Sequence, residues 1–181
     1  MQVGSPRSQS SRLPLLHNVQ KRRKLQRKVD SYSVHFKFSQ HFDLQPDEAY
    51  EWCTDYDSGD IKLQGRDGIR KTQWINEDTI LLTDLNYVGA RRVAKRKLVR
   101  LYPERLSWTN TRVSSEGKHS QFLYEISGEK GGSRLDFTGS QVFHGKKPSA
   151  ARLQTIAGDL AKENSAIWRN LAKAMAGDLR R

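Results

Sequence analysis

The sequence predicts an α+β domain in which a seven-stranded antiparallel sheet is covered by one long C-terminal helix. Strand-like segments follow one another through turns too short for crossovers, and parallel neighbours would need connections of a dozen or more residues. The long helical pattern comes at the C-terminal end and has one apolar face. A helix face of that length needs a wide apolar surface to cover, and the sheet offers one.

Residues 1–30 differ in composition from the rest of this 181-residue chain. They hold eight of its 32 lysines and arginines but one of its 20 acids, and few apolar side chains. Such a segment cannot bury enough apolar surface to fold, so we expect a disordered basic tail before a domain at 31–181. Three interpretations stay open: a solvated tail, a transit peptide, or an arm that contacts nucleic acid or an anionic surface. The cations that would make this contact are Lys21, Arg22, Arg23, Lys24, Arg27 and Lys28.

Ordered structure is expected to begin at Ser33. Val34, Phe36, Phe38 and Phe42 alternate with polar residues, as in a half-buried strand. The segment Leu44-Gln45-Pro46-Asp47-Glu48 then opens a short helix, with proline and acids in its first turn. Residues 54–60 have the composition of a turn.

Six further strands are expected between Gly68 and His144, separated by turn residues. Their predicted ranges are Ile69–Ile75, Thr79–Tyr87, Val93–Leu101, Arg105–Val113, His119–Ile126 and Ser133–Phe143. The alternation places Trp108, Tyr124 and Phe137 on one apolar face, and this face is the natural partner of the C-terminal helix.

The C-terminal helix is predicted over Ser149–Leu179. Ile156, Leu160 and Trp168 belong to a stripe with intervals of three and four residues, which Asn164 interrupts near its middle. A buried amide at that point needs a partner, for which a ligand, an ordered water or a backbone group of the sheet would serve.

This order of elements resembles the START-like helix-grip (SRPBCC) superfamily, which contains polyketide cyclases, pollen allergens and lipid-transfer domains. The resemblance covers residues 33–180. Its local mark is the segment Leu44–Trp52, similar to the family's helix that ends in Trp before an Asp-containing turn, here Asp55 and Asp57. The resemblance implies a sheet curled around the long helix, one or two short helices after the first strand, and a cavity between sheet and helix.

Known catalytic motifs are absent from the sequence, and no cofactor or metal site is expected. The five histidines are scattered, with His35 and His41 opposite the phenylalanines and therefore expected at the surface. The single cysteine, Cys53, excludes an internal disulfide, suits a reducing cytoplasm, and is expected to pack as a small apolar side chain. No apolar run is long enough to span a membrane.

Two stretches could bring polar groups to the cavity. Asp84, Asn86 and Tyr87 are candidates, although the apolar run Ile80-Leu81-Leu82 leaves the inward face of that strand undetermined. The basic segment 91–100 carries cations on both faces of its predicted strand. We therefore expect at least one of them to turn toward the interior, where it could bind a carboxylate or a phosphate. The alternative is a solvated or edge strand guarded by its charge.

The sequence favours a binding protein over an enzyme. We expect it to carry or sense a small, mostly hydrophobic molecule in a cavity between the sheet and the C-terminal helix. Nine residues are predicted to contact this ligand: Phe36, Phe38, Trp108, Tyr124, Phe137, Ile156, Leu160, Asn164 and Trp168. A cyclase- or aromatase-like enzyme and a nucleic-acid-associated protein remain as alternatives, because a fold does not fix a function.

Overall fold

The computed structural model describes residues 30–65, 67–88, 91–114 and 119–178. Its strands are β1 (Ser31–Phe42), β2 (Gly68–Asn76), β3 (Thr79–Val88), β4 (Arg91–Tyr102), β5 (Ser107–Ser114), β6 (His119–Glu129) and β7 (Gly132–His144). The predicted ranges overlap all of these. The start of β5 differs, because Pro103–Arg105 forms a 3-10 turn and Leu106 has a left-handed backbone with φ 47°. The strand therefore begins at Ser107 rather than at Arg105.

The seven strands form one antiparallel sheet in the order β1-β7-β6-β5-β4-β3-β2. From β2 to β7, each strand pairs with the next one along the chain, as successive hairpins do. Only the β1–β7 pair joins distant segments, with Phe38 opposite Phe137 in its register. The predicted seven-stranded antiparallel sheet is confirmed.

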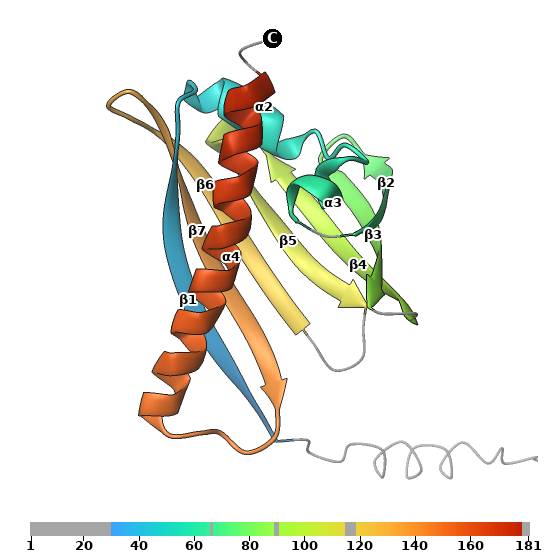
Figure 1. Ribbon diagram of the computed structural model, residues 1–181, viewed down its shortest axis with the longest axis vertical. Helices are drawn as coiled ribbons and strands as arrows, with labels where there is room; N and C mark the ends of the chain where they lie inside the picture. The colour runs from blue at the N-terminus through green and yellow to red at the C-terminus, as the bar shows by residue number, and fades with distance from the viewer. Residues whose placement is uncertain (1–29, 66, 89–90, 115–118, 179–181) are drawn as a thin grey trace, which may run out of the picture.

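Three helices lie on one face of the sheet: α2 (Pro46–Thr54), α3 (Asp60–Leu63) and α4 (Ala150–Asp178) (Figure 1). The first turn of α2 has its proline and acids where they were expected, and the backbone N–H of Gln45 donates to Glu48 Oε2 over 3.2 Å. This capping contact satisfies a donor that the helix cannot satisfy itself. The short helices after β1 and the long C-terminal helix agree with the predicted helix-grip architecture.

The two halves of α4 differ in how deeply they are buried. Its C-terminal half buries Trp168, Leu171 and Met175 against the sheet, whereas Leu153 and Leu160 in its N-terminal half are half-buried. The helix crosses the sheet lengthwise and packs mainly on β1 (Figure 1). The helix is therefore anchored to the sheet near its C-terminal end and packs less closely on the sheet near its N-terminal end.

An aromatic cluster forms this anchor. Trp108 and Tyr124 stack with their ring centres 4.7 Å apart, and Trp168 lies 5.5 Å from Tyr124 and 6.3 Å from Trp108. Tyr50 of α2 meets Trp108 edge-on at 5.8 Å, and Phe42 of β1 lies 6.2 Å from Trp168. Such pairs add about 0.5–1.5 kcal/mol each to the burial of their surfaces.

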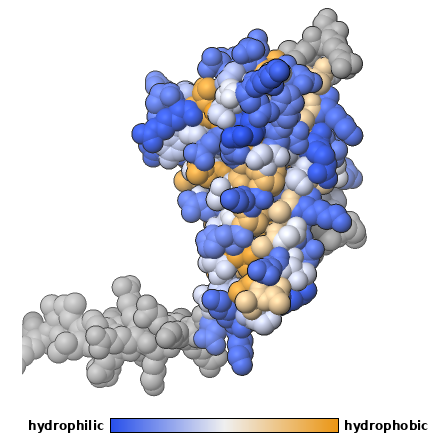
Figure 2. Space-filling model, turned by 90° about the vertical axis from the view of Figure 1, so that its left-hand side faces the viewer, coloured by the Kyte–Doolittle hydropathy of each residue, from blue (hydrophilic) through white to orange (hydrophobic). Residues whose placement is uncertain are grey.

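Figure 2 shows the face seen from the β1 side of the molecule. Apolar side chains form a band along its middle, and hydrophilic residues flank the band on both sides. The edge strand β1 itself is guarded by the exposed polar residues His35, Lys37 and His41, so the two histidines lie at the surface as expected.

Residues 1–29, which include all of the predicted tail except its last residue and all six cations named for the contact, lie outside the described residues. Among the helices that the structure does describe, none is both long enough and apolar enough to cross a bilayer.

We predict that Trp168→Ala lowers the free energy of unfolding by about 3–5 kcal/mol, because it removes a large buried ring from the aromatic cluster. Urea denaturation followed by circular dichroism measures the change. Lys173→Ala, on the exposed side of α4, serves as the control and should change stability by less than about 0.5 kcal/mol. Equal stability of the two variants would show that the helix is not anchored through Trp168.

Candidate ligand-binding site

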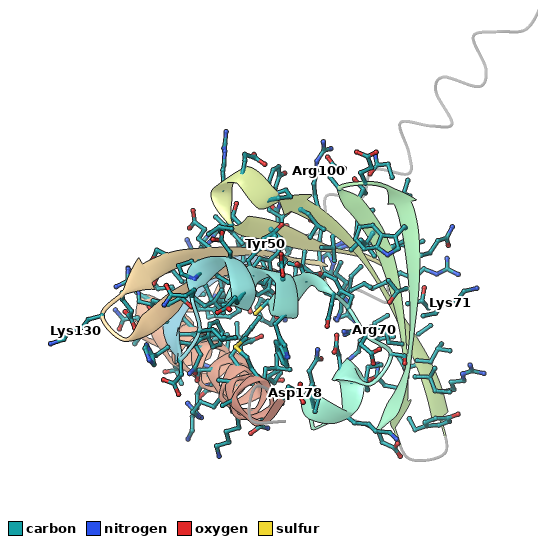
Figure 3. The ribbon with its side chains drawn as sticks, turned by 90° about the horizontal axis from the view of Figure 1, so that it is seen from above. Tyr50, Arg70, Lys71, Arg100, Lys130 and Asp178 are labelled. Carbon is teal, nitrogen blue, oxygen red and sulfur yellow. The ribbon has the colours of Figure 1, made fainter. Side chains whose placement is uncertain are left out.

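A cavity of about 480 Å³ lies between the inner face of the sheet and the middle of α4, residues 156–171. Its volume falls in the range of small-molecule sites in proteins. The space exists because α4 is anchored near its C-terminal end while its preceding turns are less buried. In Figure 3, Arg70 points to the side of the sheet where α3 and α4 lie, whereas its neighbour Lys71 points away.

One part of the cavity wall is apolar and mostly aromatic. The side chains that form it come from α2, the loop after α2, the sheet and α4: Trp52, Tyr56, Trp108, Phe122, Tyr124, Phe143, Ile156, Leu160, Ile167, Trp168 and Leu171. This wall offers flat rings and branched aliphatic groups to a ligand, which is the kind of surface that supplies affinity without demanding hydrogen bonds.

The structure brings together six of the nine side chains predicted to contact a ligand. Trp108, Tyr124, Ile156, Leu160, Asn164 and Trp168 all line the cavity. The three phenylalanines do not: Phe36 and Phe38 pack on Phe137, with ring centres 5.7 and 4.5 Å away. These rings belong to the hydrophobic core, where β1 and β7 pair.

Asn164 has a hydrogen-bond partner other than the three expected from the sequence. Its side-chain Nδ2 donates to the backbone oxygen of Leu160, one helical turn earlier, over 2.8 Å. The partner is neither a ligand nor the sheet, because a short amide side chain can reach back to its own helix. The side-chain N–H of Asn164, which interrupts the apolar stripe, is therefore paired within α4 itself.

A buried charge network contributes Asp60, Arg70 and Lys97 to another part of the wall. The guanidinium of Arg70 donates from Nε to Asp84 Oδ1 and from Nη1 to Asp60 Oδ2, both over 2.8 Å. Lys97 Nζ lies 2.6 Å from the other oxygen of Asp84. The side chains of Arg70 and Asp84 are each 2% exposed. The network joins α3 to β2, β3 and β4, and breaking such a buried pair by removing one partner typically costs about 3–5 kcal/mol.

The pKa values of the two carboxyl groups in this network are shifted in opposite directions. Burial alone would raise the pKa of Asp84, but Lys97 and Arg70 outweigh it and lower that pKa to about 2. Burial dominates at Asp60 and raises its pKa to about 6, although Arg70 opposes the shift. The difference arises because Asp84 has two cations and Asp60 has one.

Alternation along β3 decides the orientation that the sequence left open. Ile80, Leu82, Asp84 and Asn86 are all buried. Asp84 and Asn86 therefore point inward, whereas Tyr87 is 50% exposed and points outward. Asn86 and Tyr87 point in opposite directions because consecutive side chains of a strand cannot share a face.

The basic strand β4 brings Lys95 and Lys97 to the cavity, as expected for at least one of its cations. Arg112 joins them from β5, directly opposite Lys97 in the register. The edge-strand alternative is wrong, because β4 lies between β3 and β5. Asp159 and Glu163 of α4 also line the cavity, so its walls carry charges of both signs.

One buried amide in the wall lacks a partner among the described residues. Asn110 on β5 is 7% exposed and lines the cavity, and its Oδ1 accepts no hydrogen bond there. A buried acceptor left without a donor costs about 1–3 kcal/mol. A hydroxyl or N–H group on a ligand, or a water molecule, would remove that cost.

Cys53 also lines the cavity, and it is half-buried rather than fully enclosed. Burial raises the pKa of its thiol well above the usual value, which keeps it protonated and poorly nucleophilic. Within the described parts of the chain, no group of three or more histidine, cysteine, aspartate or glutamate side chains is arranged to hold a metal ion.

Comparison with solved structures identifies the architecture. Ara h 8.0201 superimposes with a TM-score of 0.62 at 12% sequence identity, over 81% of this chain and 99% of that one. The Zhui aromatase/cyclase from Streptomyces sp. R1128 gives 0.59 at 11% identity, over 84% and 97% of the two chains. A START superfamily protein from Mycobacterium smegmatis gives 0.57 at 8%, over 79% and 98%. The chain has the START-like helix-grip fold.

Neither a protein-family model nor a curated protein sequence matches the chain. At identities of 8–12%, the helix-grip likeness establishes the fold alone. What the helix-grip domain does must therefore be argued from its cavity.

The sequence did not predict the charge network, because its members are far apart along the chain. Arg70, Asp84 and Lys97 come from three strands, and Asp60 from a short helix. Two signals pointed to it: Asp84 within an otherwise apolar strand, and the inward cation expected from segment 91–100, which includes Lys97. Asn110 sits in a strand whose alternation is clear, so its inward direction could be read, but its missing partner could not.

We predict that Asp60 makes the protein less stable as the pH rises from about 4 to 6. The folded protein binds the Asp60 proton more tightly than the unfolded chain, because the folded-state pKa is about 6. Protonated Asp60 therefore adds to the free energy of unfolding at low pH. This contribution, on the order of 2 kcal/mol, is lost as the pH rises through the folded-state pKa. Urea denaturation at pH 4.5 and 7.0 measures it.

The variant Asp60→Asn should flatten this part of the pH profile, whereas Asp67→Asn, at an exposed aspartate just before β2, should leave it unchanged. Asp84 acts in the opposite sense: its stabilisation is complete above about pH 4 and is lost as the pH falls toward 2. An unchanged slope between pH 4.5 and 7.0 in Asp60→Asn would contradict the assignment.

Proposed function

We propose that the protein binds a small amphipathic molecule in the cavity between the sheet and α4 and acts as its carrier or sensor. The observation that carries the proposal is the division of this cavity: an aromatic wall lies beside a buried amide, Asn110 Oδ1, that has no donor among the described residues. An apolar body would pack on the rings of Trp108 and Tyr124. A hydroxyl or N–H group would donate to Asn110.

The proposed ligand carries a polar end in addition to the apolar body expected from the sequence. The cavity wall includes Arg70, Lys95 and Asp60 in addition to its aromatic part, so a purely apolar ligand would leave these charged groups without water. A molecule with one polar end matches both parts of the wall. The START superfamily protein and Ara h 8.0201 have a similar fold.

A second candidate function is a cyclase- or aromatase-like reaction, and one observation favours it. The pKa of Asp60, raised to about 6 mainly by burial, lies close to neutral pH, where a carboxyl group is effective in proton transfer. Its hydrogen bond to Arg70 gives Asp60 a structural role as well. Native mass spectrometry of freshly purified protein would distinguish the two functions, because a carrier holds its ligand chemically unchanged.

We predict that the aromatic anion 1-anilinonaphthalene-8-sulfonate binds in the cavity with micromolar affinity and gains fluorescence. The variant Leu160→Trp fills the space from α4 and should weaken binding at least tenfold. Leu153→Trp is the matched control, two turns earlier on the same helix, half-buried and outside the cavity. Equal weakening by both variants, or by neither, would exclude the cavity as the binding site.

We also predict that Asn110→Leu separates stability from binding. The change removes a buried acceptor without a donor and keeps the side chain's size, so it should raise the free energy of unfolding by about 1 kcal/mol. The same change should lower the affinity for the native ligand, which loses its hydrogen bond. Thermal melts without ligand and native mass spectrometry of the copurified complex measure the two effects. Loss of stability in the free protein would show that Asn110 serves the fold.

A further inference from the structure

The outer face of the sheet at β2–β5 is left uncovered by the described helices, because α2, α3 and α4 all lie on the opposite face (Figure 1). The register places Lys71 beside Thr83, Thr83 beside Arg96, and Leu98 beside Thr111. These residues share the parity that points away from the buried Arg70 and Asp84. We call the outward-pointing side chains of β2–β5 the outer β2–β5 surface.

Large apolar side chains are exposed on this surface. Ile69 and Ile75 are each 56% exposed, Val113 is 53% exposed, and Tyr87 is 50% exposed. The half-buried Leu85 pairs with Ile69 and so extends the apolar area from one strand to the next. Ile75 lies six residues further along β2, and Val113 lies on β5, so the apolar groups are distributed over the surface. Exposed apolar side chains on an uncovered sheet face mark a surface that can meet an apolar partner.

Cations lie among these apolar groups. Lys71, Arg92, Arg96 and Arg100 all occupy outward positions, and the outward positions described in β2–β5 hold neither aspartate nor glutamate. Arg100 pairs with Asp78, at the turn between β2 and β3, over 3.3 Å. Figure 3 shows Lys71 and Arg100 directed away from the enclosed side of the sheet. The surface is therefore apolar and positively charged, and an anionic partner with an apolar interior complements it.

We propose that the outer β2–β5 surface docks on a membrane that contains anionic lipids. Exposed isoleucines can enter the boundary between headgroups and acyl chains, while lysine and arginine attract the lipid charge. Single-stranded nucleic acid complements the charge but not the apolar part, since bases stack on aromatic rings and the exposed groups are mostly aliphatic. The proposal does not rest on the cavity: a helix-grip domain without a ligand would present the same surface.

The test is cosedimentation of the full-length protein with phosphatidylcholine vesicles, with and without phosphatidylserine. Binding should require phosphatidylserine and should weaken as salt is added. The variant Lys71→Gln should lower the affinity about fivefold, which is the effect of one cation near a charged membrane. Lys37→Gln is the matched control: it also removes an exposed, outward-pointing lysine, but from β1 at the other edge of the sheet. Equal loss in the two lysine variants would overturn the proposal.

The apolar contribution is tested by the double variant Ile69→Ser/Ile75→Ser, which keeps every charge and should lower vesicle affinity at least tenfold. A full-length variant with Lys21, Arg22, Arg23 and Lys24 changed to glutamine measures what the basic tail contributes. Binding lost in this tail variant but unchanged in the isoleucine variant would overturn the proposal. So would tight binding of an oligouridylate that the isoleucine changes leave unaffected, because this result would assign the surface to nucleic acid.

Discussion

The packing of Trp168 on Trp108 and Tyr124 is the interaction on which the remaining architecture depends. It fixes α4 near its C-terminal end, where Leu171 and Met175 are also buried. The preceding turns of the helix cover the sheet less closely, and a cavity of about 480 Å³ separates the two. A helix buried evenly along its length would fill this space with its own side chains, so the position of the aromatic cluster determines that there is room for a ligand.

Each charge of the buried network has a specific partner. Arg70 neutralises Asp84 and Asp60, and Lys97 completes the environment of Asp84. The arrangement holds α3 against three strands, yet it places ionised groups beside an aromatic wall. A buried ion pair adds little net stability compared with apolar packing, whereas losing one partner is costly. The network therefore constrains the shape of the cavity more than it strengthens the fold.

The sequence was sufficient for the architecture, since hairpin spacing and helix periodicity are local patterns. It was less informative about the cavity, which depends on distances between elements. The phenylalanines of β1 have the right parity, but strand pairing with β7 places Phe36 and Phe38 on Phe137 in the core. Asn164 lies in the wall, but its partner is a carbonyl of its own helix. Parity fixes the face on which a side chain lies, and only the three-dimensional packing decides whether that face meets a ligand or another side chain.

The strand order also has a consequence for how the chain folds. Five of the six strand pairs are hairpins, which close short loops quickly. The remaining pair, β1 with β7, joins residues about a hundred positions apart, for example Phe38 with Phe137. During synthesis, β1 emerges first but meets its partner only after the other six strands have been made, and α4 follows later still. We therefore expect the hairpins to form a nucleus onto which β1 and α4 dock last, with β1 exposed to wrong partners in the meantime.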